Sequence, residues 1–122
     1  MNDNIFVRTK KQFKKNIYPT LFSDYLSTDD RSRIATWLRK KTKCVCYVIK
    51  EKQEIVSVLL LSKSTPTIWN LIFIYTVPKF RREGYAYTLL SYVSKEKTIH
   101  TTAVNKQVDA LFHKVCLLNK SL

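Results

Sequence analysis

The sequence has one glycine in 122 residues, where average usage would give about eight or nine. This residue, Gly84, lies between an apolar, β-branched run that Pro78 ends and a segment with apolar residues at helical spacing. A glycine at such a junction permits a positive φ angle and close approach of a ligand. The free N–H groups of the loop and of the first helical turn then point at one spot, where the helix dipole is positive. The segment predicts a cradle for an anion such as phosphate or pyrophosphate, although Gly84 could merely ease a tight turn.

The order of strand-like and helix-like segments indicates the fold class. Residues 43–50 and 54–62 are β-branched runs separated by a polar turn, which predicts an antiparallel hairpin. Residues 67–104 read as strand, helix and strand, a crossover unit whose two strands lie parallel. We therefore expect an α/β (α+β) fold in a single domain over residues 1–122. The predicted strands are 5–8, 43–50, 54–62, 67–77 and 98–104, and the predicted helices are 28–41, 85–97 and 105–114.

Basic residues are in large excess, with a formal net charge of +13. This charge favours anionic partners such as nucleic acid, a phosphorylated cofactor or an acidic membrane surface, although it can also serve solubility alone. The basic stretch 9–18, which stops at Pro19, has no determined role. Its lysines are interleaved with Phe13 and Tyr18, so it could contact phosphates while the rings stack on bases, or form a solvated helix.

Cysteine usage and hydropathy bear on the compartment. Three cysteines without a C-x-x-C pair, and no apolar h-region near the start, indicate a reducing, cytoplasmic setting. The longest nearly continuous apolar run, residues 55–61, is broken by Ser57 and is far shorter than the ~20 residues that span a bilayer. We therefore expect a soluble protein. The spacing of cysteine and histidine matches no common zinc framework, so no metal is expected.

A family resemblance begins at the segment around the glycine. The motif Arg81-x-x-Gly84-x-Ala86 follows a strand and opens a helix, and it resembles the acetyl-CoA motif R/Q-x-x-G-x-G/A of the GNAT superfamily of N-acetyltransferases. The order of elements over residues 43–114 is also similar to that of the family, and Asn105 resembles the Asn that opens its last helix. The resemblance implies a mixed, mostly antiparallel sheet with a central, splayed pair of parallel strands, flanked by helices.

The same resemblance implies how acetyl-CoA is bound. Loop amides would hold the pyrophosphate, with Arg81, Arg82 and Lys79 adding charge. A main-chain N–H of Thr76 or Val77 would hydrogen-bond the thioester carbonyl, and an amine would take the acetyl group directly in a ternary complex. The implied cofactor-binding residues are Thr76, Val77, Arg81, Arg82, Glu83, Gly84, Tyr85, Ala86, Tyr87 and Asn105.

Two departures from the family pattern concern catalysis and assembly. Phe112 occupies the position where the family often has the Tyr that protonates the leaving thiolate, and a phenyl ring has no proton to give. Tyr75, His113 or Cys116 could replace it, and no residue is assigned as the base. The chain also has room for only one strand after residue 114. A homodimer that covers the exposed sheet edge is therefore a hypothesis.

These observations leave three functional interpretations. The first is an acetyl-CoA-dependent N-acetyltransferase whose amine acceptor, such as a protein or a nucleic-acid-associated complex, is not identified. The second is a GNAT-like module without transfer activity that binds coenzyme A, a protein partner or nucleic acid. The third is a small nucleic-acid-binding protein, whose binding would weaken steeply with salt.

Overall fold

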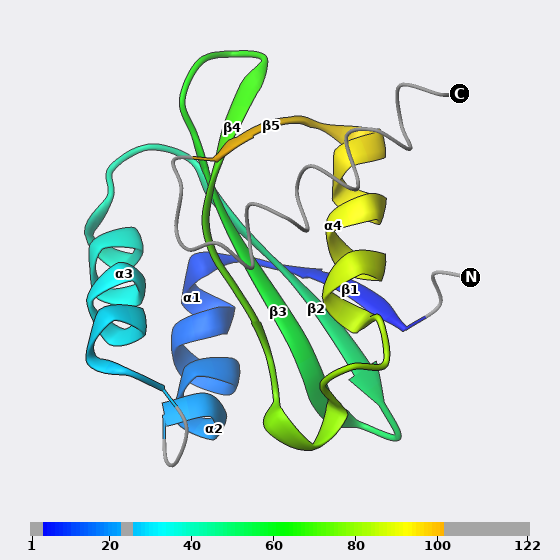
Figure 1. Ribbon diagram of the computed structural model, residues 1–122. Coiled ribbons are helices and arrows are strands. Elements are labelled where there is room, and N and C mark those ends of the chain that lie inside the picture. Colours follow the sequence, from blue (N-terminus) through cyan, green and yellow to red (C-terminus); the bar gives the residue numbers. More distant parts are fainter. Residues whose placement is uncertain (1–3, 23–25, 102–122) are drawn as a thin grey trace.

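A curved five-stranded sheet with helices on both faces forms the body of the protein (Figure 1). The computed structural model describes residues 4–22 and 26–101. The strands are β1 Ile5–Arg8, β2 Cys44–Glu51, β3 Glu54–Lys63, β4 Ile68–Thr76 and β5 Thr98–Thr101. The helices are α1 Lys10–Gln12, α2 Tyr18–Phe22, α3 Thr28–Arg39 and α4 Tyr85–Glu96, with a π-helical turn η1 Phe13–Ile17 and a 3₁₀ turn η2 Pro78–Phe80.

The strands lie side by side in sequence order. Neighbours from β1 to β4 are antiparallel, whereas β4 and β5 are parallel and are connected through α4. The predicted hairpin and the predicted crossover unit are both present, and the predicted mixed fold class is confirmed. Residues 98–101 of β5 pair with residues 68–71, the first four residues of β4. Residues 72–76 of β4 lie beyond the part of β5 that the structure describes.

The sheet separates two hydrophobic clusters. The α4-face cluster packs α4 on β2, β3 and the start of β4, and its members include Tyr47, Ile49, Leu59, Leu61, Trp69, Leu71, Leu89, Leu90 and Val93. The α1–α3-face cluster lies on the other side, and its members include Phe13, Ile17, Ile34, Trp37, Cys46, Val48, Val58, Leu60, Phe73 and Tyr75. Trp37 also donates its indole N–H to the carbonyl oxygen of Leu61 at 2.8 Å, which fixes α3 to the sheet.

A β-bulge divides β4 into two halves. Leu71 pairs with Leu61 and Phe73 pairs with Leu60, so Ile72 is an extra residue in the ladder. Side chains therefore change faces at this point: Leu71 belongs to the α4-face cluster, whereas Phe73 and Tyr75 belong to the α1–α3-face cluster. The bulge sets the direction of every side chain near the end of β4.

The segment after β1 differs from its prediction. Pro19 was expected to stop the basic stretch, but it lies inside α2. A π turn comes directly before it, in which the Tyr18 N–H bonds to the Phe13 carbonyl five residues back. This change in hydrogen-bond spacing lets the helical path continue through a residue that has no N–H.

Burial also contradicts one possible role of this stretch. Phe13 is 0% exposed and packs edge-on against Trp37, so its ring is not accessible for stacking on a base. Lys10 donates its ammonium N–H to the carbonyl oxygen of Lys40 at 2.6 Å. The proposed stacking of nucleic-acid bases on Phe13 is therefore wrong.

Helix ends agree with the predictions to within two residues. Ser27 caps α3 by accepting the Asp30 N–H at 3.1 Å, and the helix ends at Arg39 rather than at residue 41. The expected remainder of strand 98–104 and the expected helix 105–114 lie outside the described residues. No helix within the described ranges is long and apolar enough to cross a membrane.

Candidate functional site

The loop between β4 and α4 contains two residues in the left-handed backbone region. Arg82 has a φ of 69°, and Gly84, which caps α4, has a φ of 82°. A Cβ built at Gly84 would meet no atom within 4 Å. The glycine is therefore required by its backbone conformation and not by crowding, and the space above it is open.

The N-terminus of α4 presents hydrogen-bond donors to this open space. The Thr88 N–H is bonded to the Gly84 carbonyl at 2.9 Å, which leaves the preceding amides of Tyr85 and Ala86 without an acceptor inside the helix. Gly84 has no side chain that could cap them, and residues 81–84 are exposed. Converging amides at a helix N-terminus favour an anion.

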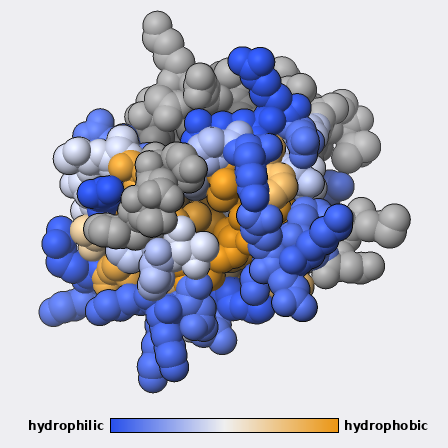
Figure 2. All heavy atoms as spheres, turned by 90° about the horizontal axis from the view of Figure 1, so that it is seen from below, coloured by the Kyte–Doolittle hydropathy of each residue, from blue (hydrophilic) through white to orange (hydrophobic). Residues whose placement is uncertain are grey.

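The basic side chains of the loop differ in what they contact. Lys79 forms an exposed ion pair with Glu54 at 2.6 Å, which is worth little in water. Arg81 turns back toward β4 and donates its Nε–H to the Thr76 carbonyl at 2.9 Å. Arg82 makes no hydrogen bond or ion pair with the described residues, so its charge is available to a ligand. Figure 2 shows the end of the molecule where this loop lies, with hydrophilic side chains around a hydrophobic area.

Hydrogen bonds fix the end of β4. The Val77 N–H donates to the Val56 carbonyl of β3 at 2.8 Å. Bonding alternates along an antiparallel pair, so the preceding amide, that of Thr76, faces the opposite edge of β4. That edge is the one that β5 joins further along the strand. Of the two predicted thioester contacts, the Val77 amide is already used by the sheet.

Ser57 adds a second constraint at the same place. Its side chain is 0% exposed, and its hydroxyl donates to the Tyr75 carbonyl at 3.0 Å. Because a serine has one O–H donor, the 3.0 Å contact between the Ser57 and Thr76 hydroxyls has Thr76 as its donor. In the sequence, Ser57 stands out only as an interruption of the apolar run 55–61. That interruption was the available signal for a buried polar role.

Comparison with known proteins identifies the family. Residues 11–116 match the model of the acetyltransferase (GNAT) family. The chain belongs to this family. The comparison with curated proteins found no match.

Solved structures of other GNAT and acetyltransferase proteins share the fold. An IAA acetyltransferase from Bacillus cereus ATCC 14579 has a TM-score of 0.66 at 19% identity, over 90% of this chain and 73% of that one. A ribosomal-protein-alanine N-acetyltransferase from Brucella melitensis biovar Abortus 2308 has a TM-score of 0.62 at 14% identity, over 91% and 88%. The aminoglycoside N-acetyltransferase AAC(6')-Iy, in complex with CoA, has a TM-score of 0.57 at 12% identity, over 91% and 88%. At these identities the likeness shows the fold alone.

In this GNAT chain, Tyr75 is the one predicted proton donor that lies among the described residues. Its side chain is 7% exposed, its ring stacks on Phe73, and the Arg81 guanidinium carbon is 5.4 Å from its centre. The structure therefore brings Tyr75 and Arg81 together at the end of β4. Asn105, Phe112, His113 and Cys116 lie outside the described residues.

The phenol of Tyr85, the first residue of α4, remains neutral beside the loop that contains Gly84. Burial raises the pKa of its phenol, and the nearby carboxylates of Glu51 and Glu83 raise this pKa further. Because an unperturbed tyrosine already titrates near pH 10, a raised pKa keeps the hydroxyl protonated at neutral pH. The Tyr85 side chain adds no negative charge where an anion would bind. Among the described residues, no group of three or more His, Cys, Asp or Glu side chains could hold a metal ion.

Proposed function

We propose that this protein transfers an acetyl group from acetyl-CoA to a primary amine. Membership of an acetyltransferase family supports the reaction class, and a neighbour of the same fold is solved in complex with CoA. The observation that carries the proposal is the open, left-handed Gly84 at the N-terminus of α4. A pyrophosphate accepts hydrogen bonds from several amides at once, which is what this turn offers.

Each loop residue has a distinct part in holding the cofactor. Main-chain amides of residues 82–87 bind the pyrophosphate, and Arg82 supplies the available positive charge. Arg81 bonds the Thr76 carbonyl through its Nε–H, and its other guanidinium N–H groups add charge and donors for the phosphate. Asn105 binds the pantetheine arm in this proposal.

Acetyl transfer takes place at the end of β4. The Thr76 N–H donates to the thioester carbonyl and stabilises the oxyanion that forms when the amine nitrogen attacks. A C–N bond forms, the C–S bond breaks, the amine loses a proton and the coenzyme A thiolate gains one. Direct attack in a ternary complex needs no covalent enzyme intermediate, so positioning supplies much of the acceleration.

The proton donor to the thiolate is either Tyr75 or His113. Phe112 cannot serve, since it has no ionisable proton, and general acid catalysis is typically worth about 10²- to 10⁴-fold. Tyr75→Phe and His113→Gln separate the two candidates. The variant that lowers kcat without changing the affinity for acetyl-CoA identifies the donor.

A matched pair of substitutions at Gly84 tests the cofactor site. Asp and Asn have the same size and both tolerate a positive φ, so Gly84→Asp and Gly84→Asn differ mainly in charge. We expect Gly84→Asn to bind acetyl-CoA several-fold more weakly than wild type, and Gly84→Asp to show no measurable binding by calorimetry. Circular dichroism checks that both fold. Unchanged affinity in Gly84→Asp would remove the basis of the proposal.

A cofactor-binding module without transfer activity is the alternative, and the Phe112 side chain is what favours it. This alternative predicts that acetyl-CoA binds normally and that no amine is acetylated, including the lysines of the protein itself. Mass spectrometry of the protein and of a peptide library after incubation with acetyl-CoA distinguishes the two functions. A mass increase of one acetyl group that Gly84→Asp abolishes supports transfer.

We also propose where the protein works and how it assembles. Residues 1–122 form one acetyltransferase domain that works in the reducing cytoplasm on an acceptor carried by a protein or a nucleic-acid complex. Burial raises the pKa of the Cys46 thiol, which keeps it protonated and unreactive. A homodimer covers the sheet edge, and a monomeric mass by light scattering at micromolar concentration would contradict it.

A further inference from the structure

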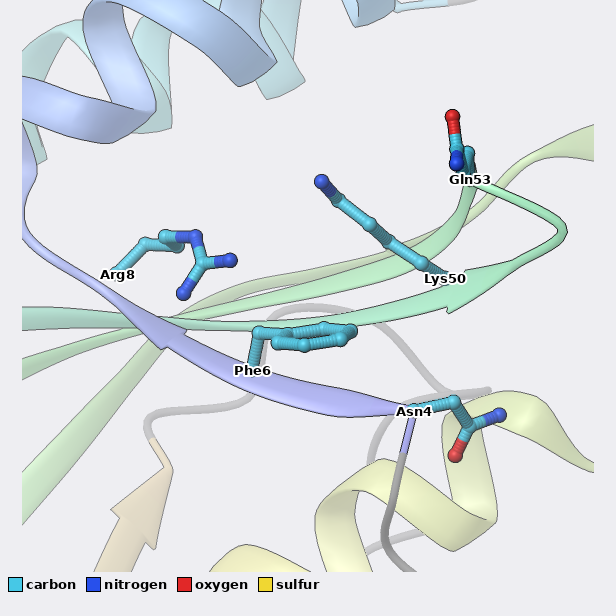
Figure 3. Close-up of a pocket in the computed structure, with 5 residues that line it drawn as sticks. All are labelled: Asn4, Phe6, Arg8, Lys50 and Gln53. Atoms are coloured by element: carbon cyan, nitrogen blue, oxygen red, sulfur yellow. The ribbon is translucent and has the colours of Figure 1, made fainter.

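A second basic hollow lies at the edge of the sheet formed by β1 and β2. It has a volume of about 410 Å³ and is lined by Asn4, Phe6, Arg8, Lys50 and Gln53 (Figure 3). The Arg8 and Lys50 side chains reach toward each other above the Phe6 ring, with their charged ends 5.0 and 5.8 Å from its centre. This volume is within the usual range for small-molecule sites.

The positive charges of Arg8 and Lys50 both lie at the hollow, and no described carboxylate forms an ion pair with either of them. Arg8 donates one guanidinium N–H to the carbonyl of Val7 at 3.0 Å, which leaves most of its five donors for a ligand. The ring face of Phe6 offsets only part of the repulsion between Arg8 and Lys50. An anion between the two cations would complete the arrangement.

This hollow is separate from the loop at Gly84. Phe6 and Arg8 pair with Val48 and Cys46, which belong to the α1–α3-face cluster, and directly paired residues of antiparallel strands share a face. The α4 helix packs on the opposite face. A pyrophosphate bound at the start of α4 would therefore lie on the opposite face of the sheet from the hollow.

We propose that the hollow binds a small phosphorylated molecule with an aromatic or heteroaromatic ring. A guanidinium fork and an ammonium group are a suitable pair for a phosphate. The remaining volume and the Phe6 ring suit a flat organic part, which stacks or packs edge-on at about 4.5 to 7 Å between ring centres. Gln53 also lines the hollow, and its side-chain amide offers a further donor and acceptor.

Binding of phenyl phosphate tests this site, with phenol and inorganic phosphate as partial ligands. We expect phenyl phosphate to bind more tightly than either part alone by calorimetry or ligand-observed NMR. Arg8→Gln should weaken binding at least tenfold, Lys50→Gln about threefold or more, and Arg8→Lys by an intermediate amount because it keeps the charge and loses the fork. Circular dichroism confirms that each variant is folded.

Two control variants locate the bound phosphate. Lys41→Gln removes the same charge from an exposed position before β2, and Arg82→Gln removes it from the loop beside Gly84. Lys41→Gln should bind phenyl phosphate as wild type does, and Arg82→Gln should keep the part of the binding that Arg8→Gln removes. A loss in Lys41→Gln equal to that in Arg8→Gln would show a general charge effect, and a loss confined to Arg82→Gln would place the phosphate at the α4 loop. Either result overturns the proposal.

The remaining outcomes concern the kind of ligand. Equal binding of phenol and phenyl phosphate would mean that the site does not select a phosphate, which overturns the assignment. A single-stranded oligothymidylate that binds far more tightly than phenyl phosphate, and whose affinity is the same in Arg8→Gln, would show a nucleic-acid surface elsewhere and no dedicated small-molecule site.

Discussion

The hydroxyl of Ser57 shows how one buried polar atom can serve an active site that it does not touch. It is bonded to the Tyr75 carbonyl and to the Thr76 hydroxyl, the two residues that precede the proposed cofactor loop. Arg81 holds the Thr76 carbonyl from the other direction. Together these bonds fix the peptide plane that presents the Thr76 N–H, so we propose that Ser57 is a positioning residue for the thioester contact.

Replacement of Ser57 by alanine should lower both stability and turnover. The Tyr75 carbonyl still pairs with Val58 in the β3–β4 ladder, so the loss is that of one side-chain hydrogen bond, which typically costs about 0.5 to 1.5 kcal/mol. We expect the free energy of unfolding to fall by about that amount, and kcat to fall several-fold while KM for acetyl-CoA changes less than twofold.

Ser62→Ala is the matched control for this prediction. Ser62 is also buried on β3, but it pairs with Asn70, at the opposite end of β4 from Thr76. It should change stability without changing kcat. Equal kcat values for Ser57→Ala and wild type would show that Ser57 has only a structural role.

Among the elements, the β2–β3 hairpin contains an unusual turn. Lys52 and Gln53 have φ angles of 51° and 66°, the signature of a type I′ turn, which normally takes Asn-Gly or a similar pair. A side chain in the left-handed region costs roughly 1 kcal/mol. The hairpin therefore contains local strain that the paired strands tolerate.

Gln53→Gly should relieve this strain. Part of the gain is lost because glycine has more freedom in the unfolded chain, so we expect an increase of about 0.5 kcal/mol in the free energy of unfolding, measured by urea denaturation. Gln53→Ala keeps the Cβ and should change stability less. A decrease in Gln53→Gly would mean that the Gln53 side chain contributes more than its backbone costs.

The sequence predicted these elements unevenly, for identifiable reasons. The hairpin and the third strand are β-branched, apolar runs with defined ends, and α4 has helical spacing, so their bounds were correct to within one residue. A helix was one alternative for the basic stretch, but its continuation through Pro19 was missed because a π turn has no pattern in one sequence. The bulge at Ile72 was missed because a nearly continuous apolar strand does not reveal which side chain faces which cluster.

The sequence predicted where the candidate site lies, in the loop around Gly84, but it did not predict the hydrogen bonds of that loop. Gly84 stood out as the single glycine, and its positive φ followed from the strand-to-helix junction. The bond from Arg81 to Thr76 and the use of the Val77 amide by β3 depend on side-chain rotamers and strand register. Neither the rotamer nor the register can be predicted from the residue types alone.

For the whole molecule, the net charge of +13 and the proposed phosphate site at the start of α4 both favour an anionic ligand. A positive field raises the rate at which an anionic cofactor arrives, and salt screens it. The lysines and arginines therefore need not all contact a ligand to contribute to its binding.

Thermal unfolding with acetyl-CoA tests the molecule as a unit. A ligand at 100 times its Kd adds about 2.7 kcal/mol to the free energy of unfolding, which should raise Tm by several degrees for a domain of this size. Gly84→Asp should show no rise, and a DNA duplex provides a comparison for general anion binding. A rise with the duplex and none with acetyl-CoA would favour the nucleic-acid interpretation.

The bond from Trp37 to Leu61 also gives the protein an optical probe. The sequence has two tryptophans, and Trp37 is completely buried with its indole N–H held at the residue where the β3–β4 ladder changes register. Its emission therefore reports whether α3 is docked on the irregular part of the sheet. In a Trp69→Phe background, a red shift that precedes the loss of far-ultraviolet dichroism would show α3 separating from the sheet before the strands come apart.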